Sequence, residues 1–279
     1  MADRGSAAVV TGVALLALLA AGAASPALGQ EVPKGHLVIS GGGGMPDRIF
    51  ARAIQLAGGP DAPVVVFPQA SEEADTGDVV SDQWRKAGSK TVSPISLTDL
   101  AAATRAVEAA SLIWFTGGDQ VKLLKALEGT GIPEVIARRY REGAVVGGKS
   151  AGAAVMSSIT LTGDADLQSV TAGATKTMPG LGLWLGVIVD QHFLKRQRHS
   201  RLLSLVLEHP SLVGVGIDED TAVVVTGPHV EVIGDSSVVV IDARRAAVEP
   251  RAAGALSAAR RIVTHVLTEG MGMEIAPRP

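Results

Sequence analysis

The chain of 279 residues contains no cysteine. Disulfide frameworks, zinc–thiolate sites and thiol catalysis are therefore excluded. Aromatic residues are only 3% of the chain, so the core must consist mainly of Val, Leu, Ile and Ala, for which the 47% hydrophobic content is sufficient. A basic excess is absent as well, because the net charge is −3, and we expect no nucleic-acid partner.

One long apolar run stands near the N-terminus. Residues 7–24, AAVVTGVALLALLAAGAA, carry no charge, follow Arg4 and precede the small residues of SPALGQ. This pattern is typical of a secretory signal peptide, so we assign residues 1–29 to a cleaved leader and residues 30–279 to a single α/β domain. The expected location is secreted or periplasmic. An uncleaved leader would instead serve as a membrane anchor.

Apolar strands alternate with amphipathic helices in the first half of the domain. The expected strands lie within residues 36–44, 62–70, 90–96, 111–119 and 143–150, and the expected helices within 47–58, 97–110 and 120–129. This alternation predicts a mostly parallel sheet with helices on both faces. Functional residues gather at the carboxyl ends of such strands, where the stretches GGGG, TGGDQ and GGKSAG lie.

The pattern changes after residue 160. A strand running into a loop is expected over 185–193, and an amphipathic helix with a basic start over 195–209. Short strands then follow closely, within residues 212–218, 221–227, 229–234, 237–242 and 261–270. Their spacing predicts hairpins, and hence a C-terminal antiparallel extension of the same sheet.

The segment GAVVGGKSAGAA, residues 143–154, fits two motifs. From Gly143 it fits the phosphate-binding P-loop, and from Gly148 it fits the nucleophile elbow G-x-S-x-G. In a P-loop the strand precedes the first glycine, whereas here the strand AVV occupies the positions that would wrap the phosphate. The elbow is therefore favoured. It places Ser150 on a sharp turn, with the N–H of Ala151 as one oxyanion donor.

A serine hydroxyl needs a base, and the base needs an orienting acid. Among the six histidines, His192 is the best candidate because it follows a predicted strand at the same sheet end, in VDQHF. The segment GIDEDTA offers Asp218, Glu219 and Asp220 as the acid. Spacing alone does not choose among these three carboxylates.

Four stretches together resemble a known family. They are FTGGDQ (115–120), GGKSAGA (147–153), DQHFLKRQRHSRL (190–202) and GIDEDTA (216–222). The chain resembles the serine peptidases that include cyanophycinase and dipeptidase E, and the third stretch is closest to cyanophycinases. The resemblance implies a flavodoxin-like sheet, a homodimer, and no metal or organic cofactor.

The resemblance also implies roles for individual residues. The triad would be Ser150, His192 and Glu219, with Gly118 as the second oxyanion donor. The substrate site would be lined by Gln120, Asp190, Gln191, Arg196, Arg198 and Arg201. The implied substrate is cyanophycin, a poly-aspartate with arginine on each side-chain carboxyl, which the family enzyme cuts to β-Asp-Arg dipeptides. The expected chemistry is exopeptidase hydrolysis through an acyl-enzyme.

Elementary chemistry agrees with this substrate. A guanidinium binds a carboxylate as a bidentate fork, and Arg198 and Arg201 are spaced to share one helical face. Two alternatives remain open: an aspartyl or isoaspartyl dipeptidase of the same family, and a non-catalytic binding protein that kept the pocket. One residue departs from the family, because Lys149 stands where Thr is usual. We expect its side chain to point behind the elbow into solvent.

Overall fold

The computed structural model describes Met1 and residues 32–276. The assigned leader therefore lies, apart from Met1, outside the described residues. From Val32 onward the described chain forms one compact unit. No helix in this unit is long and apolar enough to cross a membrane.

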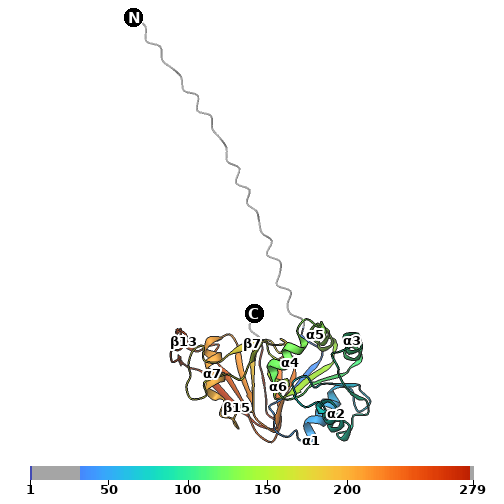
Figure 1. The fold of residues 1–279 in the computed structure, drawn as a ribbon. Helices are drawn as coiled ribbons and strands as arrows, with labels where there is room; N and C mark the ends of the chain where they lie inside the picture. Colours follow the sequence, from blue (N-terminus) through green and yellow to red (C-terminus); the bar gives the residue numbers. More distant parts are fainter. Residues whose placement is uncertain (2–31, 277–279) are drawn as a thin grey trace. The chain divides into compact units, whose positions relative to one another are not determined.

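Figure 1 shows the fold of the chain. The central sheet has the strand order β16-β11-β10-β1-β5-β4-β2-β3. Its strands are β1 (His36–Ser40), β2 (Val64–Phe67), β3 (Val92–Pro94), β4 (Leu112–Phe115), β5 (Val145–Lys149), β10 (Thr221–Thr226), β11 (His229–Gly234) and β16 (Gly272–Glu274). β1, β5, β4, β2 and β3 pair in parallel, and β10, β11 and β16 continue the sheet in antiparallel. The predicted mostly parallel α/β sheet is confirmed.

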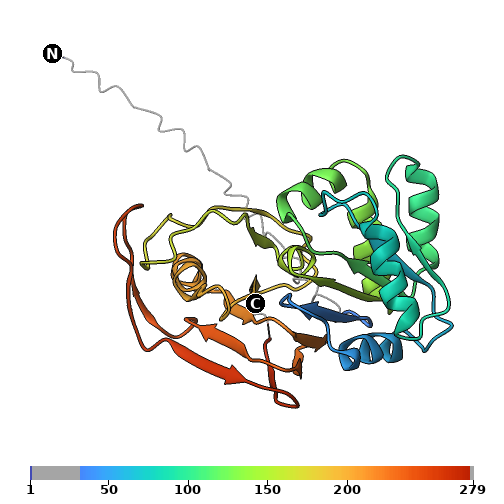
Figure 2. The same cartoon turned by 60° about the horizontal axis from the view of Figure 1, so that its bottom comes forward.

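Helices cover both faces of this sheet, as predicted. They are α1 (Asp47–Leu56), α2 (Thr76–Lys86), α3 (Leu100–Ala109), α4 (Gln120–Leu127), α5 (Ile132–Glu142) and the short α6 (Ala151–Ala154). Alternate residues of β1 point to opposite faces: Leu37 and Ile39 join a core with α3 to α6, while Val38 joins a core with α1 and α2. Figure 2 shows these helices on the two sides of the sheet.

A second sheet corrects the predicted extension. β10 and β11 do form a hairpin on the central sheet, but β9 (Val213–Ile217), β12 (Val238–Asp242) and β15 (Val263–Leu267) join β8 (Val187–Gln191) in a separate four-stranded sheet. The helix α7 (His199–Glu208) covers one face of it (Figure 2). The other face contributes Val215 and Ile217 to the core that contains Leu37, Ile39 and residues of α3 to α6. β8 and β9 are buried along their whole length, whereas four of the five residues of β15 are exposed. These strands form a separate layer rather than an edge of the first sheet.

Other boundaries also differ from prediction. The polar helix α2 was not predicted, because only Gly77, Ser81 and Trp84 of its residues are buried. The expected helix over 195–209 begins only at His199. Two small hairpins were not predicted either, β6 (Ile159–Leu161) with β7 (Thr177–Pro179) and β13 (Ala247–Glu249) with β14 (Ala258–Arg260).

Candidate active site

Ser150 lies on the turn between β5 and α6 with φ 54° and ψ −108°. A positive φ is uncommon for a residue with a side chain and marks a strained backbone of the kind that nucleophile elbows use. The turn is closely packed, since a Cβ atom on Gly148 would lie 2.5 Å from the backbone of Gly152. β5 fills the positions that a P-loop would need for phosphate, as the sequence predicted.

His192 follows β8 and also has a positive φ, 49°. Its backbone N–H donates to the carbonyl oxygen of Gly41 at 2.8 Å, which holds it against the carboxyl end of β1. Its Nε2 lies 2.8 Å from Ser150 Oγ. The predicted pair is thus brought together, although β8 belongs to the second sheet and not to the sheet that carries Ser150.

Among the described residues, only Glu219 of the three candidate carboxylates has a hydrogen bond to the imidazole of His192. Glu219 Oε1 lies 2.6 Å from His192 Nδ1. The carboxylate of Asp218 is buried and accepts the backbone N–H groups of Leu194 and Lys195 at 3.1 and 2.9 Å, so it holds the turn that follows the histidine. Glu219 is therefore the carboxylate in position to orient the imidazole.

The environment of His192 favours the neutral imidazole. Burial lowers its pKa below 6.5, and the positive charges of Arg196 and Arg198 lower the pKa further, whereas the hydrogen bond to Glu219 raises it. A neutral imidazole that donates Nδ1–H to a carboxylate leaves Nε2 free to accept a proton. Nε2 is the atom that faces Ser150 Oγ.

The backbone N–H groups of Gly118 and Ala151 have no backbone acceptor in the described chain. Ala151 directly follows Ser150. Gly117, the chain neighbour of Gly118, lies close to the serine as well, because a Cβ atom on Gly117 would lie 3.5 Å from Ser150 Cβ. Free N–H groups next to a nucleophile are the feature that stabilises an oxyanion. Asp119, which follows Gly118, caps α4, because its carboxylate accepts the backbone N–H of Val121 at 2.7 Å.

The residues expected to line a substrate site fall into a buried group and an exposed one. Arg201 is buried, and its guanidinium donates to both carboxylate oxygens of Asp190, with Nε 2.8 Å from Oδ2. Arg198 donates to the backbone and side-chain oxygens of Gln191 at 2.7 and 2.6 Å. The guanidiniums of both arginines thus have partners within the protein. The sequence had instead predicted guanidiniums that are free to bind a substrate carboxylate.

Arg196 is the exposed member of this group. It lies close enough to His192 to influence its pKa. Gln120 is buried, and its Nε2 donates to the carbonyl oxygen of Leu161 at 2.8 Å.

The family model for peptidase family S51 matches residues 36–233, which contain all the residues of the site. The chain belongs to peptidase family S51. It is therefore a serine-type peptidase, and the resemblance noted in its sequence is confirmed.

Relatives of this S51 peptidase include proteins named cyanophycinase. The one from Geminocystis herdmanii is 37% identical over 213 residues, which cover 72% of this chain and 78% of the relative. The one from Synechococcus elongatus is 35% identical over 215 residues, covering 72% and 67%. Among solved structures, a peptidase from an acI-B1 Actinobacterium has a TM-score of 0.63 at 22% identity, covering 88% of this chain and 99% of that one, and supports the fold.

Lys149 differs from its expected orientation. Its side chain does not extend into solvent behind the elbow, because Nζ lies 3.3 Å from the carbonyl oxygen of Gly43. A Cβ atom on Gly117 would lie 3.9 Å from Lys149 Cε. The side chain thus lies at the carboxyl edge of the sheet, between the loops that follow β1 and β4. Strand alternation misled here because Lys149 is the last residue of β5, where the surrounding loops determine the direction of the side chain.

The glycine run after β1 was expected only to lie at the functional edge. In the structure it is part of the site, because Gly42 packs against the imidazole of His192 so closely that a Cβ atom there would overlap the ring. Gly42 has φ 119°, which favours glycine. Its position directly after a buried strand is the signal from which this contact could have been inferred.

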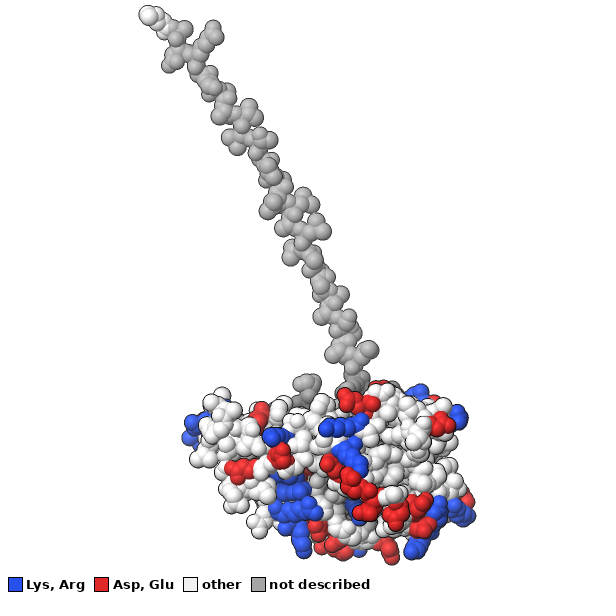
Figure 3. All heavy atoms as spheres, viewed as in Figure 1, with Lys and Arg blue, Asp and Glu red and all other residues white. Residues whose placement is uncertain are grey.

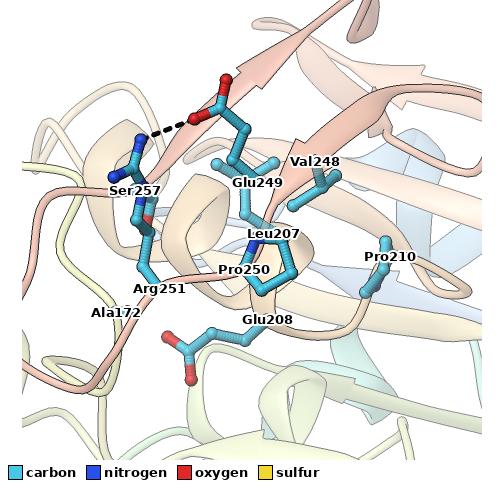
Figure 4. A pocket seen from close by; sticks show the side chains of 9 residues that line it. All are labelled: Ala172, Leu207, Glu208, Pro210, Val248, Glu249, Pro250, Arg251 and Ser257. Atoms are coloured by element: carbon cyan, nitrogen blue, oxygen red, sulfur yellow. Dashed lines mark hydrogen bonds and ion pairs between the residues drawn. The ribbon is translucent and has the colours of Figure 1, made fainter.

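One cavity of this S51 peptidase lies away from the residues of the site. A cavity of about 400 Å³ lies beside the C-terminal end of α7, lined by residues such as Glu208, Val248 and Arg251, and holds none of the predicted site residues (Figure 4). On the face drawn in Figure 3, basic and acidic side chains are interspersed. No group of three or more His, Asp or Glu side chains among the described residues is arranged to hold a metal ion.

Proposed function

We propose that this S51 peptidase hydrolyses cyanophycin and releases β-Asp-Arg dipeptides through an acyl-enzyme. The observation that carries the proposal is the hydrogen-bonded chain from Ser150 Oγ to His192, at 2.8 Å, and from His192 to Glu219, at 2.6 Å. The substrate is supported by relatives named cyanophycinase at 35–37% identity over most of their length.

The proposed reaction begins with attack of Ser150 Oγ on a backbone carbonyl of the polymer. His192 Nε2 accepts the hydroxyl proton and then gives it to the leaving amine, so an ester on Ser150 and a free amine result. Water, deprotonated by His192, cleaves the ester and restores the serine. Glu219 stabilises the imidazolium in both steps. The N–H groups of Gly118 and Ala151 stabilise the oxyanion, each by about 3 kcal/mol.

Charge beside the triad suits a polymer with a carboxylate on every unit. The buried cluster pairs one carboxylate, Asp190, with two guanidiniums, Arg198 and Arg201. The pKa of Arg198 is lowered to about 10, first by burial and then by the nearby positive charge of Arg201. The cluster therefore has an excess positive charge, to which the exposed Arg196 adds. A substrate carboxylate bound beside these guanidiniums would offset that excess.

Purified protein lacking residues 1–29 tests the proposal. It should clear a suspension of insoluble cyanophycin and release β-Asp-Arg, identified by mass spectrometry, while leaving casein intact. Ser150→Ala, which removes one oxygen, is the matched control and should release no dipeptide. Cleavage of isoaspartyl dipeptides with no action on cyanophycin would instead support the dipeptidase alternative. Binding of the polymer without turnover would support a non-catalytic role.

Export is part of the same proposal and is supported by the apolar run over residues 7–24. Mature protein from the native host should begin near residues 25–30. N-terminal sequencing of the secreted or periplasmic fraction measures this directly. Full-length protein with an intact Met1, found in soluble cytoplasm, would contradict it.

A further inference from the structure

The segment Gly41–Gly43 presents three consecutive carbonyl oxygens to three different parts of the site. The backbone N–H of His192 donates to the first at 2.8 Å, and that of Asp220 donates to the second at 2.9 Å. Lys149 Nζ donates to the third at 3.3 Å. Each donor is a member of the proposed triad or the chain neighbour of one, so this segment connects all three members.

The same segment contacts the base and the acid. A Cβ atom on Gly42 would overlap the imidazole of His192, and one on Gly43 would lie 2.8 Å from Glu219 Cβ. A shift of the segment would therefore move the imidazole relative to Ser150. Nε2 and Oγ are now 2.8 Å apart, and proton transfer between them depends steeply on that geometry.

Lys149 is the only side chain among the three donors to this segment in the described chain. It pairs with Ser40 in the parallel register of β1 and β5, and the N–H of the adjacent Ser150 donates to Ser40 O at 3.0 Å. The lysine thus reaches from the strand that carries the nucleophile to the segment that supports the base. A hydrogen bond from an ammonium is stronger than one between neutral groups.

We propose that Lys149 is a positioning residue for His192. Its ammonium holds Gly43 O and thereby keeps the segment Gly41–Gly43 against the imidazole, at hydrogen-bonding distance from Ser150. The inference rests on the proposed serine-peptidase reaction and adds a residue to it. Lys149 does not take part in the proton transfers.

Two other roles for Lys149 give different results. A lysine that bound a substrate carboxylate would change KM for cyanophycin and leave reaction with a small neutral reagent unchanged. A lysine that acted as the base would make Lys149→Arg inactive, because a guanidinium does not give up its proton, and would leave His192→Ala active. A positioning lysine lowers kcat, slows the neutral reagent and is replaceable by arginine.

The test is the second-order rate at which a neutral fluorophosphonate labels Ser150 in the purified protein lacking residues 1–29. Lys149→Met keeps the stem without the donor and should label about tenfold more slowly, with kcat for cyanophycin lowered by the same factor and KM unchanged. Lys149→Arg should label within about twofold of the wild type. The control Lys90→Met removes a lysine of a surface ion pair with Asp61, near the start of β3, and should label at the wild-type rate.

Each outcome decides the inference. Labelling of Lys149→Met at the wild-type rate would overturn it while leaving the proposed function intact. A raised KM with unchanged labelling would overturn it in favour of substrate binding. If circular dichroism shows that Lys149→Met does not fold, Lys149→Thr, which is too short to reach Gly43 O, takes its place with the same expected tenfold loss. Failure of the wild type to label at all would overturn the proposed function, and this inference with it.

Discussion

The buried pair of Asp190 and Arg201 gives the sharpest prediction about stability. The two side chains are 1% and 3% exposed, and the guanidinium bonds both carboxylate oxygens. Arg201→Met removes one charge and leaves the other without its main partner. Breaking a buried ion pair in this way costs about 3–5 kcal/mol.

The lower end of that range applies here. Arg198 Nη1 lies 3.7 Å from Asp190 Oδ1, and the N–H of Gln191 donates to the same oxygen at 2.8 Å, so the carboxylate of Asp190 keeps two weaker partners. We therefore expect a loss of about 3 kcal/mol. For a domain of this size that loss lowers Tm by about 6–12 °C, since each kcal/mol corresponds to about 2–4 °C.

Thermal unfolding followed by circular dichroism measures this effect. Arg196→Met, an exposed arginine in the same turn region, is the matched control and should change stability by less than about 0.5 kcal/mol. The double variant Asp190→Leu/Arg201→Met removes both charges and should recover most of the stability. An unchanged Tm for Arg201→Met with a raised KM would refute the structural role and restore a direct role in substrate binding.

Three further predictions concern activity, and a fourth concerns stability. Hydrolysis should fall as the pH drops through the His192 pKa, which is lowered from its ordinary value of 6.5, because the protonated imidazole accepts no proton. Arg196→Gln removes a positive charge that lowers this pKa, so it should shift the acid limb of kcat/KM to higher pH. Gly42→Ala should lower kcat by roughly 100-fold, because the added methyl group displaces the imidazole, as steady-state kinetics would show. Glu219→Gln should lower kcat by roughly 10³-fold at constant Tm. Asp218→Asn should mainly lower Tm, because it reduces the free energy of unfolding by about 1–3 kcal/mol. A large loss of kcat in Asp218→Asn together with a lowered Tm and little loss of kcat in Glu219→Gln would show that the acid is misassigned.

The elbow and the parallel strands could be predicted because their signals are local. Gly148, Ser150 and Gly152 stand at fixed spacing after an apolar strand, and the packing of that turn requires small residues wherever it occurs. The position of His192 at a strand end was likewise predictable. Its approach to Ser150 was not predictable, because β8 lies in a second sheet, and local spacing does not show how that sheet packs against the first.

The roles of charged side chains could not be predicted from spacing. Arg198 and Arg201 are three residues apart, which fixes their relative position on a helix but not what that face meets. The fold turns Arg201 inward to Asp190, eleven residues earlier in the chain. For Lys149, strand alternation gave the wrong side, because the direction of a side chain at the last residue of a strand depends on the loops around it.

Peptide mapping after fluorophosphonate labelling tests the central claim, that Ser150 is the nucleophile of a cyanophycin-degrading triad. The account predicts a single adduct on the peptide that contains Ser150, slower labelling in the presence of soluble cyanophycin fragments, and nearly complete loss of labelling in His192→Ala. An adduct on another residue, or labelling of Ser150 at full rate in His192→Ala, would contradict it.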